Sequence, residues 1–427
     1  MKKYFFISFT AIIVAGAFIA FTPKQGHPRG RGVKQPLSDR HNRSFLFISD
    51  VHLNTQSKTT AYGGDTGEDL WAAFLDKAGK VLGGPDQPEF IIYTGDLPAH
   101  YSCAGTCFLT PSQRTAHNAN ITASLGGLQV LAARYHKPIF YLPGNNDALA
   151  GDYYSFADEQ QQTPFSLIQP NRYLFPAGNH SRSFIPPCII SDPRPGMGYY
   201  SASPEKGLRI IALNTVIYNA YFTTVDGTTQ NTDGDMQMAW LASQLAEAEA
   251  RHEKVYLAMH VPPGTDAYSG HTMWATPSGT HWLNTFLGLT TRYKATIAGI
   301  LYGHTHMDEV RRIYDTTGTS ITEVAISCPG VTPQHYNNPG FKLVQYDAAS
   351  KELMDFTTYF TAPGETAWGD SSYTFSEVYG GSPGTSVYDR LSSLPLSDVS
   401  TGMNTVFTVR HGAATYNITT GIEVKKQ

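Results

Sequence analysis

Uninterrupted apolar runs of strand length recur between residues 45 and 302, and stretches with helical periodicity separate them. Because the runs are continuous rather than alternating, they are typical of strands that are covered on both faces. Strands that alternate with helices predict an α/β architecture built from layered sheets. The predicted strands are 45–48, 90–93, 139–142, 210–213, 255–259 and 297–302, and the predicted helices are 70–82, 121–135 and 236–252.

The pattern changes after residue 311. Short apolar segments joined by turn-forming residues predict antiparallel strands at 313–314, 321–326, 341–346 and 353–360. Beyond residue 361 the chain is rich in Gly, Ser, Thr and Tyr, and the pattern predicts only a helix at 387–394 and a strand at 405–410. We therefore expect a main domain over residues 44–360 and a C-terminal extension over residues 361–427 that packs on it.

The first 43 residues are typical of an export segment followed by a linker. Met1-Lys2-Lys3 precedes an apolar stretch over residues 4–21, and Ala15-Gly16-Ala17 supplies the small residues that signal peptidase needs. We expect a signal peptide over residues 1–25 and a flexible linker over residues 26–43. The predicted location is secreted or periplasmic. An uncleaved anchor through residues 4–21, which would hold the protein near a membrane, is the alternative.

Net charge and cysteine content limit the possible binding partners and predict disulfides. A formal net charge of −4 argues against a nucleic-acid polymer as partner, because binding its backbone requires a basic face. Four cysteines in an exported chain suit two disulfides, with three connectivities open. Cys103 and Cys107 are close enough in sequence to close a tight loop, so we favour Cys103–Cys107 together with Cys188–Cys328.

Metal-binding side chains follow five of the predicted strands. In α/β sheets the carboxyl ends of strands are where loops converge, so these side chains are expected to meet. They offer oxygen and imidazole ligands without a thiolate, which indicates a hydrolytic two-metal centre rather than a structural zinc site. Any one of the motifs arises readily by chance, but five in succession do not. The seven candidate ligands are Asp50, His52, Asp96, Asn145, His260, His304 and His306.

The residue types suit their expected tasks. Asp96 follows Gly95, which lets the backbone turn tightly and direct the carboxylate inward. Asn145 brings an amide oxygen, which can bind a metal without adding charge that repels a phosphate. His304 and His306 are separated by one residue, and in extended backbone such a pair can reach two different ions.

These motifs resemble those of the calcineurin-like metallophosphoesterases, over about residues 44–360. Residues 94–100, 303–308 and 329–339 resemble more narrowly the acid sphingomyelinase and sphingomyelinase-like phosphodiesterase branch, with a weaker likeness over 373–394. The resemblance implies a four-layer αββα sandwich with a small C-terminal extension. The segments that carry the family likeness are 49–52, 94–96, 144–147, 260–264 and 303–306.

The resemblance also implies two divalent metal ions, usually zinc in this branch, with Asp96 bridging them. A metal-bridging hydroxide would attack phosphorus, and His100, four residues after Asp96, would protonate the leaving oxygen as general acid. The imidazole-rich ligand set is compatible with zinc. One ion would be held by Asp50, His52, Asp96 and His306, and the other by Asp96, Asn145, His260 and His304.

One position departs from the family pattern. Asn146 stands where the family has a histidine; its amide can donate a hydrogen bond to a phosphate oxygen but cannot give up a proton. We therefore expect His100 to be the sole acid, with Asn146 assisting. His271, His281 and His335 lie in loops after motif segments and are candidates to line the substrate pocket.

The predicted function is a secreted dimetal phosphodiesterase. The span before Asp50 has no cysteine and no room for a lipid-extracting module, which favours soluble nucleotide or phosphocholine-type phosphoesters as small-molecule substrates. A phosphomonoesterase is the nearest enzymatic alternative. A non-catalytic phosphoester-binding protein, suggested by Asn146, is the alternative from another class.

Overall fold

Most of the predicted strands lie in two mixed β-sheets of the computed structural model, which describes residues 42–426 except 102–107, 179–184, 276–280 and 366. The first sheet has the order β14-β13-β12-β1-β2-β3-β4. Its strands β1 to β4 are parallel, and β12 to β14 are antiparallel. The strands are β1 (Asn42–Ile48), β2 (Ile91–Tyr93), β3 (Ile139–Tyr141), β4 (Leu174–Phe175), β12 (Gly340–Asp347), β13 (Leu353–Phe360) and β14 (Ser372–Thr374).

The second sheet has the order β15-β10-β11-β9-β8-β7-β6-β5. Strands β7, β8 and β9 run parallel in its centre, as their continuous apolar sequences predict, whereas β11, predicted to be antiparallel, pairs parallel with β9 and antiparallel with β10. The strands are β5 (Cys188–Ser191), β6 (Tyr200–Glu205), β7 (Leu208–Leu213), β8 (Lys254–Met259), β9 (Ile297–Tyr302), β10 (Val310–Tyr314), β11 (Ile321–Ser327) and β15 (Glu423–Val424).

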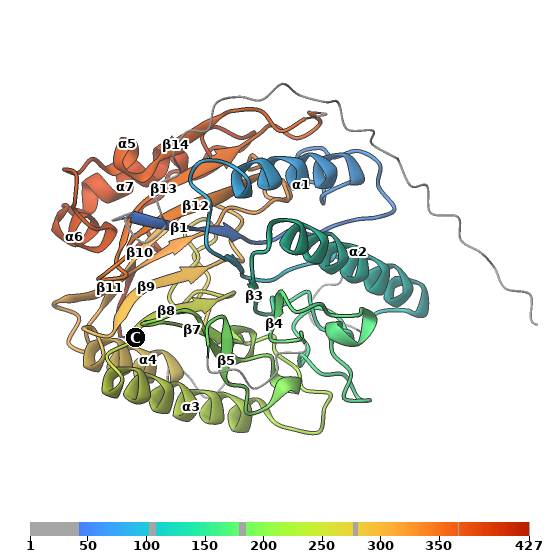
Figure 1. The fold of residues 1–427 in the computed structure, drawn as a ribbon, viewed down its shortest axis with the longest axis horizontal. Helices are drawn as coiled ribbons and strands as arrows, with labels where there is room; N and C mark the ends of the chain where they lie inside the picture. The colour runs from blue at the N-terminus through green and yellow to red at the C-terminus, as the bar shows by residue number, and fades with distance from the viewer. Residues whose placement is uncertain (1–41, 102–107, 179–184, 276–280, 366, 427) are drawn as a thin grey trace, which may run out of the picture. The chain divides into compact units, whose positions relative to one another are not determined.

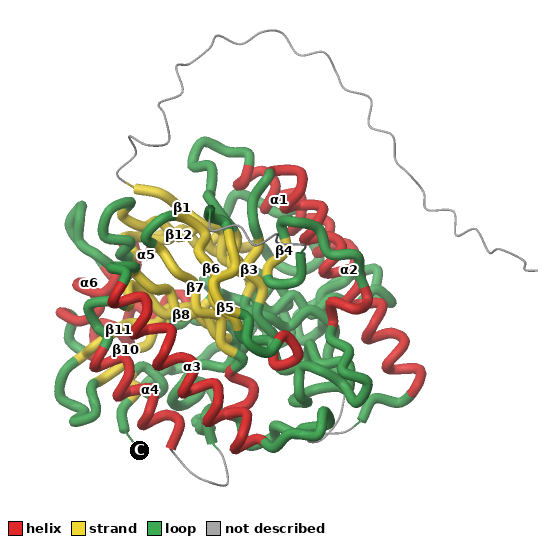
Figure 2. The backbone as a smooth tube through the Cα atoms, turned by 60° about the horizontal axis from the view of Figure 1, so that its bottom comes forward, coloured by secondary structure: helices red, strands yellow, loops and turns green. Residues whose placement is uncertain are grey.

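Helices cover the outer faces of the two sheets. The strands lie between the pair α1 (Glu68–Leu82) and α2 (Pro111–Tyr135) and the pair α3 (Gln230–Ala250) and α4 (His281–Arg292) (Figures 1 and 2). One apolar core lies between the sheets and under α1 and α2, and a second lies between the second sheet and α3 and α4. This arrangement confirms the predicted four-layer α/β sandwich.

The C-terminal residues add three short helices, α5 (Phe375–Tyr379), α6 (Val387–Ser393) and α7 (Leu396–Val406). Helix α6 packs against β11 and β13, so this segment touches both sheets. The strand predicted at 405–410 is wrong, because α7 continues to Val406 and a turn follows with Val409 and Arg410 in the left-handed region. Within the described residues, no helix has both the length and the apolar character needed to cross a bilayer.

The predicted Cys188–Cys328 disulfide is also wrong. Both cysteines are free and buried. Cys188 begins β5 and Cys328 follows β11, and four strands lie between these two in the sheet, which separates them by roughly 20 Å or more at the usual strand spacing. The Cys328 thiol instead donates to the carbonyl of Phe47 at 3.1 Å. The other predicted pair, Cys103–Cys107, lies outside the described residues.

Candidate metal centre

The loops that carry the seven candidate ligands are joined by backbone hydrogen bonds. Asp50 donates its N–H to Gly95 at 2.9 Å, and Gly303 donates to His260 at 3.1 Å. Four of the ligand residues follow β1, β2 and β3 of the first sheet, and the three histidines 260, 304 and 306 follow β8 and β9 of the second. The centre is therefore assembled at the carboxyl ends of strands from both sheets.

Five of the ligand residues have left-handed backbone, which is uncommon outside glycine but tolerated best by Asp, Asn and His. Their φ angles are 48° at Asp50, 44° at His52, 65° at Asp96, 74° at His304 and 61° at His306. The last two were predicted to lie in extended backbone, and that prediction is wrong. Each left-handed residue turns the chain sharply at a strand end, a form of backbone strain that clusters at functional sites.

Short distances connect the ligand atoms. Nε2 of His52 and Nε2 of His260 each lie 3.3 Å from Oδ2 of Asp96. Nε2 of His306 lies 3.5 Å from Oδ1 of Asp50, and Oδ1 of Asn145 lies 3.0 Å from Nε2 of His260. Three groups have ligand atoms that all lie within 4.8 Å of one another: Asp50, His52 and Asp96; Asp96, His260 and His304; and His52, His100 and His306.

Two observations show that these residues fit a pair of metal ions. Nε2 of His52 and Nδ1 of His306 are buried and make no hydrogen bond within the described part of the chain. In His52 and His260 the Nδ1 atom is held by backbone: Nδ1 of His52 donates to Pro98 O at 3.0 Å, and Nδ1 of His260 donates to Thr94 O at 2.7 Å. These contacts leave Nε2 of both rings facing Asp96, the orientation that a metal-binding imidazole requires.

The ionisation states of Asp96 and His304 agree with this role, whereas that of His260 does not until a metal ion is bound. Burial would raise the pKa of Asp96, but the charges of His260 and His52 outweigh burial and hold that pKa well below its usual value. Burial and the charge of His260 lower the pKa of His304 to about 3. Burial would also lower the pKa of His260, yet Asp96 raises it to about 9, so a metal ion must displace that proton to bind there.

A buried carboxylate that the sequence analysis gave no role supports the bridging residue. Asp147 accepts hydrogen bonds from the backbone N–H groups of Asp96, Leu97 and Gly144 at 2.7 to 3.0 Å, and from the hydroxyl of Tyr141 at 2.9 Å. Burial and the charge of Asp96 raise its pKa to about 6, although the backbone donors oppose the shift. Asp147 thus fixes the turn that presents Asp96.

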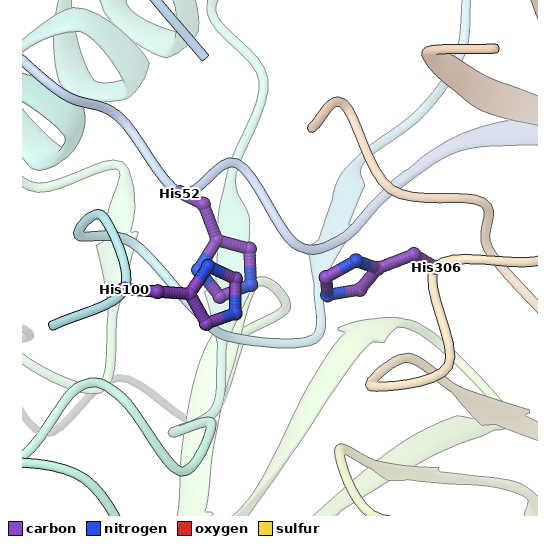
Figure 3. A group of neighbouring side chains, drawn as sticks. All are labelled: His52, His100 and His306. Atoms are coloured by element: carbon purple, nitrogen blue, oxygen red, sulfur yellow. The ribbon is translucent and has the colours of Figure 1, made fainter. Parts of the chain in front are cut away.

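His100 lies beside this centre and is hydrogen-bonded to Asp65, a second carboxylate that the sequence did not reveal. Nδ1 of His100 donates to Oδ1 of Asp65 at 2.7 Å, and its backbone N–H donates to Oδ2 at 3.0 Å. The ring stacks on His52 at a centroid distance of 3.8 Å and lies on the opposite side of the group from His306 (Figure 3). About a third of its side chain is exposed, so it can reach a substrate.

A cavity of about 590 Å³ opens over the centre. Its lining includes Asp96, His100, Asn145, His304 and His306. Of the three loop histidines named as candidates, His271 and His335 line the cavity. His281 instead begins α4, where its Nε2 lies 3.6 Å from Oδ1 of Asp235 in α3.

Asn146 is not among the described residues that line this cavity. It is buried, and its side-chain amide donates to Oδ2 of Asp96 at 3.0 Å while its backbone N–H donates to Oδ1 at 2.8 Å. The side chain that replaces the family histidine therefore holds the predicted bridging carboxylate. A neighbouring residue, Asp152, accepts from Nδ2 of Asn145 at 2.7 Å and so directs the amide oxygen of Asn145 toward His260.

The close approach of Gly144 to Asp96 gives a testable prediction. A Cβ at position 144 would lie 2.5 Å from the backbone nitrogen of Asp96 and closer still to its carboxylate, so the Asp96 turn must shift. We expect Gly144→Ala to lower the free energy of unfolding by about 1–3 kcal/mol and to weaken the binding of divalent metal ions about 10- to 100-fold. Denaturant unfolding and metal titration measure both effects.

The control is Gly126→Ala in α2, where an added Cβ meets nothing within 4 Å. That variant should be neutral or more stable by up to about 1 kcal/mol. Equal behaviour of the two variants would contradict the crowding at Asp96.

Comparison with known proteins agrees with the geometry. A family model described as calcineurin-like phosphoesterase matches residues 43–308. The chain is 30% identical over 340 residues to a sphingomyelinase phosphodiesterase D of Dictyostelium discoideum, covering 77% of this chain and 69% of that protein. It is 28% identical over 365 residues to a cyclic GMP-AMP phosphodiesterase of Homo sapiens, covering 80% and 74%.

A dimetal phosphatase from Danio rerio has the same fold, with a TM-score of 0.50 and 12% identity over 78% of this chain and 98% of that one. The strand-end motifs, the convergent ligands and these matches lead to one assignment. The chain belongs to the calcineurin-like phosphoesterase family, as a metal-dependent phosphodiesterase of its acid sphingomyelinase-like branch.

Proposed function

We propose that this protein is an exported enzyme that uses two zinc ions to hydrolyse small phosphodiesters of the phosphocholine type. The observation that carries the proposal is the pair of ligand groups that share Asp96 at one side of the 590 Å³ cavity. Export rests on the apolar stretch over residues 4–21 and the small residues within it. When bound, the two ions would neutralise phosphoryl charge and generate a nucleophile from water at neutral pH.

The chain's own residues supply the remaining steps. Asp65 accepts the hydrogen bond from Nδ1 of His100, so the proton given to the leaving oxygen comes from Nε2. Asp147 and Asn146 hold Asp96 in place through its backbone and its carboxylate, respectively. With His100 as acid, the leaving alcohol departs neutral rather than as an alkoxide.

The charge of the cavity favours phosphocholine over nucleotide esters. None of the described residues that line it is Lys or Arg, whereas Asp152, whose pKa burial raises to about 7, and Asp266 both line it. Tyr153, Tyr221 and Tyr268 add aromatic faces, and such faces attract a quaternary ammonium group by about 0.5–2 kcal/mol. A cationic choline suits these walls, whereas a nucleoside group brings no cation to them.

A substrate panel tests the proposal. We expect the zinc-loaded enzyme to cleave bis-(p-nitrophenyl) phosphate faster than p-nitrophenyl phosphate. It should prefer p-nitrophenyl phosphorylcholine to the p-nitrophenyl ester of thymidine 5′-phosphate by about 2- to 30-fold in kcat/KM. Removal of zinc with a chelator should abolish turnover, and added zinc should restore it.

Each alternative predicts a different result in the same panel. Faster cleavage of the monoester would instead identify a phosphomonoesterase. Zinc and phosphate binding without turnover of any ester would identify a phosphoester-binding protein.

A further inference from the structure

One imidazole in the cavity has no role in the chemistry described so far. His335 lies in the loop between β11 and β12 and lines the cavity beside the metal ligands. Its ring centroid is 4.6 Å from that of His306, and its Nε2 lies 3.4 Å from the hydroxyl of Tyr268. The position of His335 in the cavity contrasts with that of Asn146, whose amide is occupied by Asp96.

His335 is placed to touch a substrate rather than a metal ion. Among the described residues, His335 belongs to none of the three ligand groups given above. It does lie beside His306, which is a member of one of them. The Nε2 of His335 is paired with the hydroxyl of Tyr268, so the ring nitrogen that can donate to a bound anion is Nδ1. The side chain is half-buried, so the approach from the cavity remains open.

The loop that carries His335 is tied to the metal-binding segment. Val331 donates its N–H to Ser49 at 3.3 Å, and Thr332 donates to Asp50 at 3.1 Å. On the other side of the loop, Gly63 donates its N–H to Pro333 at 3.0 Å. These bonds fix the backbone around His335 with respect to Asp50, so the imidazole has a defined position next to the expected phosphate.

We propose that His335 donates a hydrogen bond to a phosphoryl oxygen of the bound ester, a contact that the Asn146 amide, held by Asp96, does not make. This inference rests on the proposed function, because it assigns a substrate contact in the same cavity. The chemistry is an N–H donor of a neutral imidazole to an anionic oxygen, and the charge of the acceptor strengthens such a hydrogen bond. His100 keeps the role of acid, and His335 binds the phosphoryl group.

Inorganic phosphate is the probe that tests the contact without requiring turnover. In the zinc-loaded protein, His335→Ala should raise the Kd for phosphate about tenfold or more and should lower kcat/KM for the diester by a similar factor. His335→Gln keeps an N–H donor and should retain most of the phosphate affinity. His252→Ala removes an exposed imidazole at the end of α3 and serves as the matched control. Zinc content and the melting temperature of each variant establish that it is folded and loaded.

The outcomes separate this inference from the proposed function. An unchanged phosphate Kd in a folded, zinc-loaded His335→Ala protein overturns the inference. A wild-type protein that binds phosphate through His335 but cleaves no diester overturns the proposed function and leaves the contact standing.

Discussion

Replacing His100 with alanine is expected to lower kcat for a phosphocholine diester with an alkyl leaving group by about 100- to 10,000-fold. The reason is that the leaving alkoxide is a strong base and depends on the proton of His100, whereas the candidate metal ligands stay in place. Steady-state kinetics with a metal analysis of the same sample measures both quantities. The zinc content should be unchanged, because His100 is not required by either implied ligand set.

The leaving group provides the sharpest control for this experiment. p-Nitrophenolate is a weak base that departs without protonation, so its ester should lose far less activity in the His100→Ala protein. Asp65→Asn should show a smaller loss than His100→Ala with the same dependence on the leaving group, because Asp65 acts on the reaction through the ring it orients. An equal loss on both esters would remove His100 from the role of acid.

Asp96→Asn is expected to have the second large effect, on metal binding itself. Asp96 is the carboxylate shared by two of the ligand groups, and its ionised form is stabilised by His52 and His260. The amide keeps an oxygen but loses the charge that attracts both ions. We expect zinc affinity to fall by more than the roughly 100-fold that loss of an outer-shell partner costs, with turnover falling in parallel.

A calorimetric titration of the metal-free variant with zinc checks this expectation. Asp69→Asn, on a carboxylate that contacts Thr60 near the start of α1, is the matched control and should bind zinc normally. Two zinc ions held by Asp96→Asn with wild-type affinity would contradict a bridging role for this carboxylate.

The layers and the strand-end positions of the ligands could be predicted from sequence because both depend on local pattern. Continuous apolar runs mark the parallel strands, and polar residues directly after those runs must lie at one edge of a sheet. The supporting carboxylates could not be predicted in the same way. Asp65 meets His100 across 35 residues, and Asp152 meets Asn145 through a loop whose path no periodicity reveals.

The errors have physical causes of the same kind. Apolar positions near residue 405 suit a short helix as well as a strand, and packing of α7 against α5 decides between them. The pairing of Cys188 with Cys328 assumed proximity that only the strand order could establish. Helix α2 begins at Pro111 rather than near residue 121, because Thr110 and Gln113 form a capping box ahead of its apolar part.

The division of the ligands between the two sheets has a consequence for the stability of the whole molecule. Bound ions would link the two sheets directly. Their ligands would be Asp50, Asp96 and Asn145 from the first sheet and His260 and His304 from the second. Because the apolar core between the sheets already holds them together, bound ions would add to that stability by an amount that rises with the free metal concentration.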